Sequence, residues 1–365
     1  MPVKVRDHSI DHMRALAAAL VFYWHGIHQM GVKFTVVPDN WILSVFEEGW
    51  IGVTLFITIT GFIFTTITAG SDIDYLKFMR NRVLRILPLM FIIMLFHVTF
   101  GKVETYSLLL FFNLLGGGLI PGAWTLAVEF QFYAAYPYLR KRLVHDSLGR
   151  TIIACLGLML FFFFFRYCFF LSKGHVQALS YWTIFGQIDA FLSGIVGGLV
   201  YLRARETPIA HQRRIAGLVF AVSGLAFLFA MSWFNARGGF YGTARSSVWL
   251  SWLTLMSVLC GTMITSYVIL MRGVRNRVSR WFGYIGEISY STYLLHFLTL
   301  GVASKMYVNY VGYEFSSDLM TNKTLVLLLF HYPLTLLLSA TSYEIIEKSF
   351  HHKTDYLRPA GGAMA

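Results

Sequence analysis

The chain consists of long apolar segments separated by short polar connections. Each apolar segment is close to the roughly 20 residues that a helix needs to cross a bilayer. The segments lie at about 15–32, 49–69, 84–101, 124–139, 151–171, 181–201, 215–235, 248–271, 283–303 and 324–347. This pattern predicts an all-α integral membrane protein with about ten transmembrane helices.

An eleventh candidate segment, 105–121, is short and ends in three glycines and Pro121. Counting it as a span would invert the orientation of all later segments, so loop charge decides between ten and eleven. With ten spans, 22 of the 30 Lys and Arg residues lie on the side of both termini and seven on the other side. Because cytoplasmic loops are enriched in Lys and Arg, this predicts ten spans in the cytoplasmic (inner) membrane, with both termini cytoplasmic. Segment 105–121 is then a re-entrant or interfacial piece.

The composition agrees with a membrane protein. Hydrophobic residues make up 56% of the chain and charged residues 13%, whereas soluble domains average about a quarter charged. A net charge of +12 would suggest nucleic acid as the partner of a soluble protein, but here the topology explains it and we expect no nucleic-acid partner. The loops are too short to form a separate soluble domain, so we expect one transmembrane domain over residues 1–365.

Ionisable residues inside the spans are candidates for function, because each is costly in a bilayer unless it is paired or hydrated. Arg14 and His25 are eleven positions apart, which places them on one helix face about 16 Å apart. Such a pair could hold the anionic head of a ligand and act on its far end. The spacing alone leaves open that Arg14 is a topological flank and His25 a hydrogen-bonded core histidine.

Two arginines begin the third span. Arg82 and Arg85 are three positions apart and share a helix face. Guanidinium groups pair bidentately with phosphate oxygens, so they suit a multi-phosphate ligand that arrives from the cytoplasm. As topological anchors they would need no ligand.

The fourth span contains a carboxylate, Glu129, with Tyr133 four positions later. A buried carboxylate needs a partner, and His25 or an arginine is a candidate. Glu129 could orient and polarise the imidazole of a general base, or it could serve helix packing alone.

A polar stripe near the end of the chain contains Ser289, Tyr293 and His296. Ser289 and His296 are two turns apart, about 10 Å along a helix, which is too far to predict a catalytic dyad. The stripe lines an acceptor site or packs against another helix. The three cysteines lie in apolar stretches without metal-ligand spacing, so we expect no metal.

Together these segments resemble the membrane-bound acyltransferase 3 family. The similarity lies in five elements in chain order: Arg14 with His25, Gly49–Phe62 (GWIGVTLFITITGF), Phe78–Pro88 (FMRNRVLRILP), Trp124–Pro137 (WTLAVEFQFYAAYP) and Ile288–His296 (ISYSTYLLH). One departure is Thr60, where many relatives have serine.

The resemblance implies an O-acyltransferase that moves an acyl group from cytoplasmic acyl-CoA, most often acetyl-CoA, to an extracytoplasmic acceptor. The acceptor would be a hydroxyl of a glycan or lipid-linked sugar, as in exopolysaccharide or O-antigen modification. On this interpretation Arg14, Arg82 and Arg85 bind the CoA phosphates, and His25 is the general base, oriented by Glu129. The remaining candidates would line the substrate site: Tyr133, Ser289 and His296.

Three alternatives remain open at this point. The donor could be succinyl-CoA or another acyl-CoA, and the acyl group could pass directly or through an acyl-histidine. Ten spans with buried ionisable groups also fit a proton-coupled secondary transporter or flippase that performs no chemistry. Against the transporter, the sequence has no evident pair of interrupted repeats.

Overall fold

The computed structural model describes residues 8–31, 41–100, 122–145, 147–306, 319–350 and 355–359. The longer helices are α1 (Ser9–Gln29), α3 (Gly52–Thr68), α4 (Tyr75–Phe100), α6 (Ala123–Leu143), α7 (Leu148–Lys173), α9 (Ile184–Ala204), α10 (Ile209–Asn235), α12 (Trp252–Met271), α13 (Arg277–Glu287), α14 (Ser289–Met306) and α16 (Tyr332–Ser342). Shorter helices are α2 (Ser44–Glu47), α8 (Gln177–Trp182), α11 (Gly239–Gly242), α15 (Leu319–Val326) and α17 (Lys348–Phe350). The short 3-10 turns are η1 (Trp41–Leu43), η2 (Gly49–Ile51) and η4 (Ser247–Leu250), and the π-helical turns are η6 (Leu327–His331) and η7 (Tyr343–Glu347). The expected piece 105–121 lies outside the described residues.

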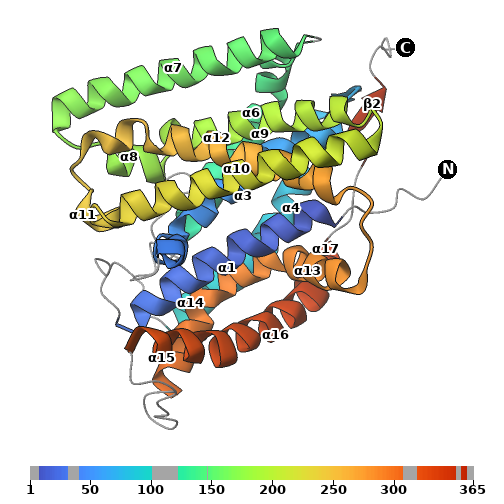
Figure 1. Cartoon of the computed structure of the whole chain (residues 1–365). Helices are drawn as coiled ribbons and strands as arrows, with labels where there is room; N and C mark the ends of the chain where they lie inside the picture. Colours follow the sequence, from blue (N-terminus) through green and yellow to red (C-terminus); the bar gives the residue numbers. More distant parts are fainter. Residues whose placement is uncertain are drawn as a thin grey trace.

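The long helices run between two ends of a bundle (Figure 1). The start of α1 and strand β2 (Leu357–Pro359) lie at one end, and α8, α11 and α15 lie at the other. The described chain therefore begins and ends on the same side of the molecule. The assignment of that side to the cytoplasm stays a prediction from loop charge.

A small feature departs from the all-helical expectation. Strand β1 (Ser71–Ile73) pairs antiparallel with β2 and joins the end of the described chain to the start of α4. Next to it, Asp74 accepts a hydrogen bond from the backbone N–H of Lys77 and forms an ion pair with Arg358. The bond from Lys77 and the charge of Arg358 lower the pKa of the Asp74 carboxyl. Three-residue strands leave no period-2 pattern long enough to predict.

Six stretches of the described chain are long and apolar enough to cross a membrane. They are Gly49–Thr68, Leu148–Lys173, Ile184–Ala204, His211–Asn235, Trp252–Met271 and Thr321–Phe350. The other four expected spans are also helical and lie on α1, α4, α6 and α14, the last preceded by part of α13. These four helices carry the polar residues singled out in the sequence, such as Arg14, Arg82, Glu129 and His296. Several helices thus support a multi-pass membrane protein, and the number ten stays a prediction.

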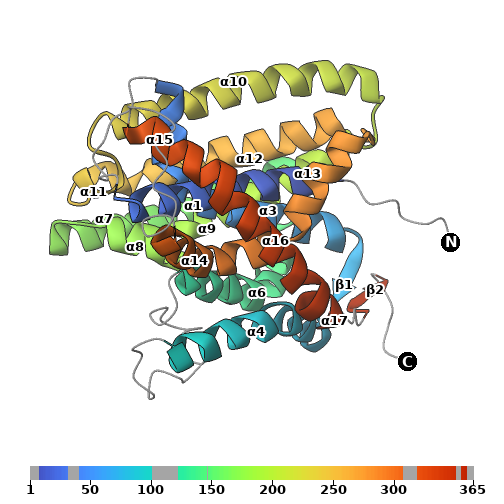
Figure 2. The ribbon, with the colours of Figure 1, turned by 90° about the horizontal axis from the view of Figure 1, so that it is seen from below.

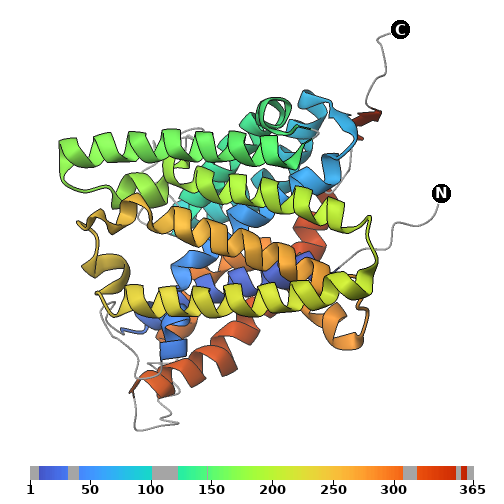
Figure 3. The ribbon, with the colours of Figure 1, turned by 45° about the horizontal axis from the view of Figure 1, so that its top comes forward.

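Close packing of small residues holds the bundle together around α3 and α9. A Cβ atom on Gly61 would lie 2.2 Å from the carbonyl oxygen of Phe191, and one on Gly194 would lie 2.0 Å from that of Thr58. Such contacts between backbones need small residues, which are enriched where membrane helices meet. Helices α7, α9, α12 and α10 follow side by side (Figure 3), and α16 crosses the opposite face obliquely (Figure 2).

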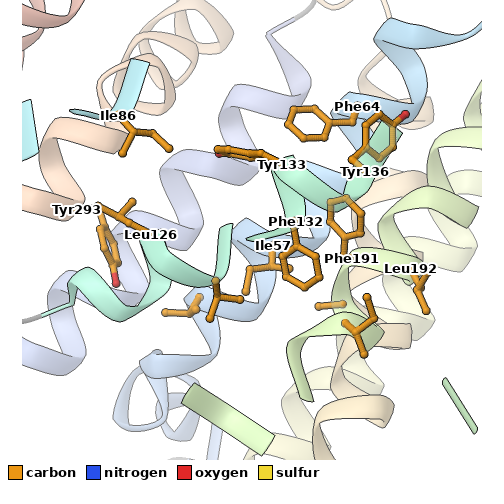
Figure 4. Packing of buried hydrophobic residues seen from close by; sticks show 14 of the residues in the cluster. Ile57, Phe64, Ile86, Leu126, Phe132, Tyr133, Tyr136, Phe191, Leu192 and Tyr293 are labelled. Atoms are coloured by element: carbon orange, nitrogen blue, oxygen red, sulfur yellow. The ribbon is translucent and has the colours of Figure 1, made fainter. Parts of the chain in front are cut away.

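A buried apolar cluster lies where α3, α4, α6, α9 and α14 meet. In Figure 4 the ring of Phe132 faces that of Phe191, with a centroid separation of 4.5 Å. Tyr133 and Tyr293 belong to the same cluster but also reach polar partners. The apolar cluster therefore supports the polar residues of the candidate site from one side.

A buried ion pair joins α7 to α9. Arg166 donates to the carboxylate of Asp189 at 2.9 Å, to the carbonyl oxygen of Phe185 at 3.0 Å and to the hydroxyl of Thr254 at 3.0 Å. Both charged side chains are fully buried. Their pairing accounts for two of the ionisable residues inside the spans without a catalytic role.

Candidate active site

Two histidines from distant parts of the sequence meet in the bundle. Nδ1 of His25 on α1 lies 3.1 Å from Nε2 of His296 on α14, although the residues are 271 positions apart. His25 is half-buried and His296 is buried. The ring of Phe297 packs against His25 at a centroid distance of 4.5 Å. Both imidazoles are therefore held in place by neighbouring helices.

The hydrogen bonds fix which nitrogen of each ring carries the proton. Nδ1 of His296 lies 2.5 Å from the carbonyl oxygen of Tyr293, which can only accept, so this Nδ1 is protonated and Nε2 has the lone pair. His25 then donates from its own Nδ1 to His296, or to the carbonyl oxygen of Val21 at 3.0 Å. In either case Nε2 of His25 keeps a lone pair, and it makes no hydrogen bond to any described residue.

His25 faces a cavity that we call the aromatic pocket. Its lining includes Trp24, His25, Trp50, Trp124, Tyr181 and Phe240. Several of these rings contact one another, such as Trp124 with Tyr181 at 4.8 Å and Tyr181 with Phe240 at 5.0 Å between centroids. Its lining includes residues of α8 and α11, two helices that lie at the same end of the bundle (Figure 1).

A second cavity, the arginine pocket, lies nearer the other end. Its lining includes Arg14, Arg82, Arg85, Glu129, Tyr133 and Ser289. Tyr133 donates to the carboxylate of Glu129 at 2.7 Å. The guanidinium of Arg82 lies over the rings of Phe64 and Phe78.

The arginine pocket is rich in positive charge. Within the described chain, neither Arg82 nor Arg85 forms an ion pair or a hydrogen bond. Arg14 pairs with Asp11 at 3.4 Å, outside the pocket lining. Three guanidinium groups therefore share one pocket with a single lining carboxylate, Glu129, which makes the pocket suitable for an anion.

The two pockets adjoin. Val53 and Tyr293 line both. The Tyr293 hydroxyl accepts from Thr125 at 2.8 Å and donates to the carbonyl oxygen of Gly122 at 3.1 Å. Tyr293 is thus a fixed partition between the arginine pocket and the aromatic pocket.

Comparison with known proteins identifies the family of the chain. A family model described as an acyltransferase domain (Acyl_transf_3) matches residues 7–344. The chain belongs to the acyltransferase 3 family. It is also similar to "Putative acetyltransferase ORF330" of Acidianus two-tailed virus, at 23% identity over 306 residues, which covers 80% of this chain and 83% of the viral protein. No solved structure matches the chain significantly. The protein is therefore an acyl-transferring enzyme.

The structure brings most of the predicted residues of this acyltransferase into two groups. Arg14, Arg82 and Arg85 lie together in the arginine pocket, and Glu129 lies there with them. Glu129 is not among the hydrogen-bond partners of His25. We expected Glu129 to lie beside His25 of the acyltransferase and to orient it. His296 takes this position instead.

The other predicted substrate residues lie in different places. Tyr133 and Ser289 line the arginine pocket and not the aromatic pocket. The Ser289 hydroxyl is buried and has no hydrogen-bond partner in the described part of the acyltransferase. His296 lies behind His25 instead of lining either pocket.

Three buried glutamates of the acyltransferase were missed: Glu47, Glu48 and Glu347. Glu347 is buried and accepts from Ser291, whereas Glu344, which lies in the same predicted span, is exposed and pairs with Lys348. Glu48 is buried just before η2 and accepts three hydrogen bonds. The sequence feature that could have indicated its burial is the pair Glu47-Glu48 close to a tryptophan before an apolar run.

Proposed function

We propose that this acyltransferase transfers an acyl group, in the first instance acetyl, from acyl-CoA in the arginine pocket to a sugar hydroxyl in the aromatic pocket. The observation that carries the proposal is the position of His25. His25 lines the pocket that adjoins the arginines across Tyr293, and its hydrogen bonds through Nδ1 leave a lone pair on Nε2. A neutral imidazole in this position is a suitable general base.

On the donor side, the guanidinium groups of Arg14, Arg82 and Arg85 bind the phosphates of CoA. The pantetheine arm extends toward Tyr293 and presents the thioester near His25. With the loop-charge topology, the arginine pocket opens toward the cytoplasm of the inner membrane, where acyl-CoA is available.

On the acceptor side, the rings of Trp24 and Trp124 offer flat apolar surfaces for a sugar of a glycan or lipid-linked glycan. His25 Nε2 removes the proton of the acceptor hydroxyl while its oxygen attacks the thioester carbonyl. The carbon–sulfur bond then breaks, and the imidazolium returns the proton to the departing CoA thiolate. His296 accepts from Nδ1 of His25 and so keeps Nε2 as the base.

A direct test is incubation of the purified protein in nanodiscs with radiolabelled acetyl-CoA and a crude envelope-glycan fraction. We expect release of CoA and transfer of label to the glycan. Succinyl-CoA and longer acyl-CoAs, assayed in parallel, identify the donor. If no acyl-CoA is consumed or bound, the donor assignment of the arginine pocket is wrong.

Removal of an arginine from the donor pocket should weaken donor binding. We expect Arg82→Ala and Arg85→Ala each to raise the acyl-CoA concentration for half-maximal rate by about tenfold or more, because each removes a charge-assisted bond to phosphate. Initial rates at varied acetyl-CoA measure the effect. Arg80→Ala is the matched control, since Arg80 is exposed on the same helix and does not line the pocket. An unchanged donor dependence in both pocket variants would contradict the assignment.

A further inference from the structure

The wall of the aromatic pocket is held by a residue outside the pocket. Phe240 and Tyr241, on α11, line the pocket. Glu48 does not line it, yet its carboxylate accepts from the backbone N–H of Phe240 at 3.2 Å. Phe240 is held on its other side as well, because Gln177 donates to its carbonyl oxygen at 2.6 Å.

The Glu48 carboxylate joins three separate segments. Besides Phe240, it accepts from Nε1 of Trp50 at 2.6 Å and from Nδ2 of Asn235, at the end of α10, at 2.9 Å. Glu48 is 1% exposed. A buried carboxylate with three N–H donors is a fixed bridge, because removal of the acceptor leaves three buried donors unsatisfied.

The backbone of α11 fits closely around this carboxylate. Gly239 has a φ of +59°, and a Cβ atom there would lie 1.9 Å from Oε1 of Glu48. Glycine is needed both for this conformation and for the close approach. Gly239 therefore allows the backbone N–H of Phe240 to reach the Glu48 carboxylate.

We propose that Glu48 is a positioning residue for the acceptor: it holds Phe240 and Tyr241 as one wall of the aromatic pocket and thereby sets the affinity for the glycan. Glu48 reaches the site through Phe240, whose ring contacts Trp24 next to the catalytic histidine. The inference rests on the proposed use of the aromatic pocket by the acceptor. It assigns no role to Glu48 on the donor side.

The test measures the hydrogen bond between Glu48 and Phe240 separately from the effect of Glu48 on acceptor binding. Hydrogen exchange followed by mass spectrometry in nanodiscs reports the protection of the Phe240 amide, which needs no assumption about function. Label transfer at varied envelope-glycan and varied acetyl-CoA concentrations reports the two substrate dependences. We expect Glu48→Ala to lose the protection and to raise the half-saturating glycan concentration about tenfold, with the acetyl-CoA dependence unchanged.

Two further variants keep the proposal testable if the Glu48→Ala protein does not fold. Gly239→Ala acts from the other side of the bridge and should reproduce both effects. Glu48→Gln should stay close to wild type, because Oδ1 of Asn235 has no hydrogen-bond partner among the described residues and the Asn235 amide can turn to accept from the new glutamine. Burial raises the pKa of Glu48 to about 7, and the same turn of Asn235 would accommodate its protonated form.

Glu47→Gln is the matched control, since Glu47 is also buried but makes no hydrogen bond to α11. Unchanged protection in Glu48→Ala and Gly239→Ala would overturn the bridge. Lost protection with an unchanged glycan dependence would overturn the role in positioning the acceptor. Failure of the wild type to label any glycan would instead contradict the proposed function, and the exchange result would still stand by itself.

Discussion

We expect His25→Ala to lower acyl transfer by about 10²–10⁴-fold, the usual contribution of a general base. The substitution removes the pocket-lining imidazole that pairs with His296, while the arginine pocket keeps its lining. Donor binding should therefore be retained. The measurements are label transfer from acetyl-CoA to the envelope-glycan fraction and, separately, binding of CoA to the same preparation.

His28→Ala is the matched control for this prediction. His28 lies one turn further along α1 and lines the same pocket, but His25 is the residue that contacts His296. We expect His28→Ala to change the rate far less. His296→Ala should fall between the two, because His25 keeps its acceptor at Val21 but loses the partner that fixes its ring. Normal transfer by His25→Ala would rule out the mechanism.

The largest effect on stability should come from Asp189→Ala. This change leaves Arg166 fully buried without its counter-charge, and breaking a buried ion pair in this way costs about 3–5 kcal/mol. The Thr254 hydroxyl and the Phe185 carbonyl remain as hydrogen-bond partners of Arg166 but carry no charge. Thermal unfolding of the detergent-solubilised protein should show a markedly lower midpoint than wild type.

The double variant Arg166→Met/Asp189→Leu distinguishes charge from packing. Replacement of both members of a buried pair by apolar residues is often neutral, so we expect the double variant to recover most of the stability that Asp189→Ala loses. A double variant as unstable as Asp189→Ala would show that packing, and not the unpaired charge, sets the cost. Activity per folded molecule should change little, because neither residue lines the two pockets at the site.

Much of the fold and part of the site could be predicted from the sequence because both depend on short-range spacing. Each apolar segment that was expected to span lies on helical structure. Arg14 and His25 share α1, and Arg82 and Arg85 share α4, since helix geometry fixes neighbours eleven and three positions apart.

The remaining features depend on contacts between helices that no local period reveals. The pairing of His25 with His296 joins α1 to α14, and one sequence contains no signal for it. Glu129 was assigned to the histidine because a buried carboxylate needs a partner, but Tyr133 on its own helix supplies that partner. Around Glu347, the π-helical turn η7 departs from the period of 3.6 residues on which predictions of buried helix faces rest.

The partition at Tyr293 also bears on the permeability of the membrane. If donor and acceptor enter from opposite compartments, the enzyme never has to carry a whole substrate across; only the small acyl group passes the plane of Tyr293 and Val53. The tyrosine is held by Thr125 and Gly122, so the acyl group passes beside a side chain that keeps its place. Chemistry between two compartments can then proceed without an ion leak, and the thioester supplies the driving force in place of a gradient.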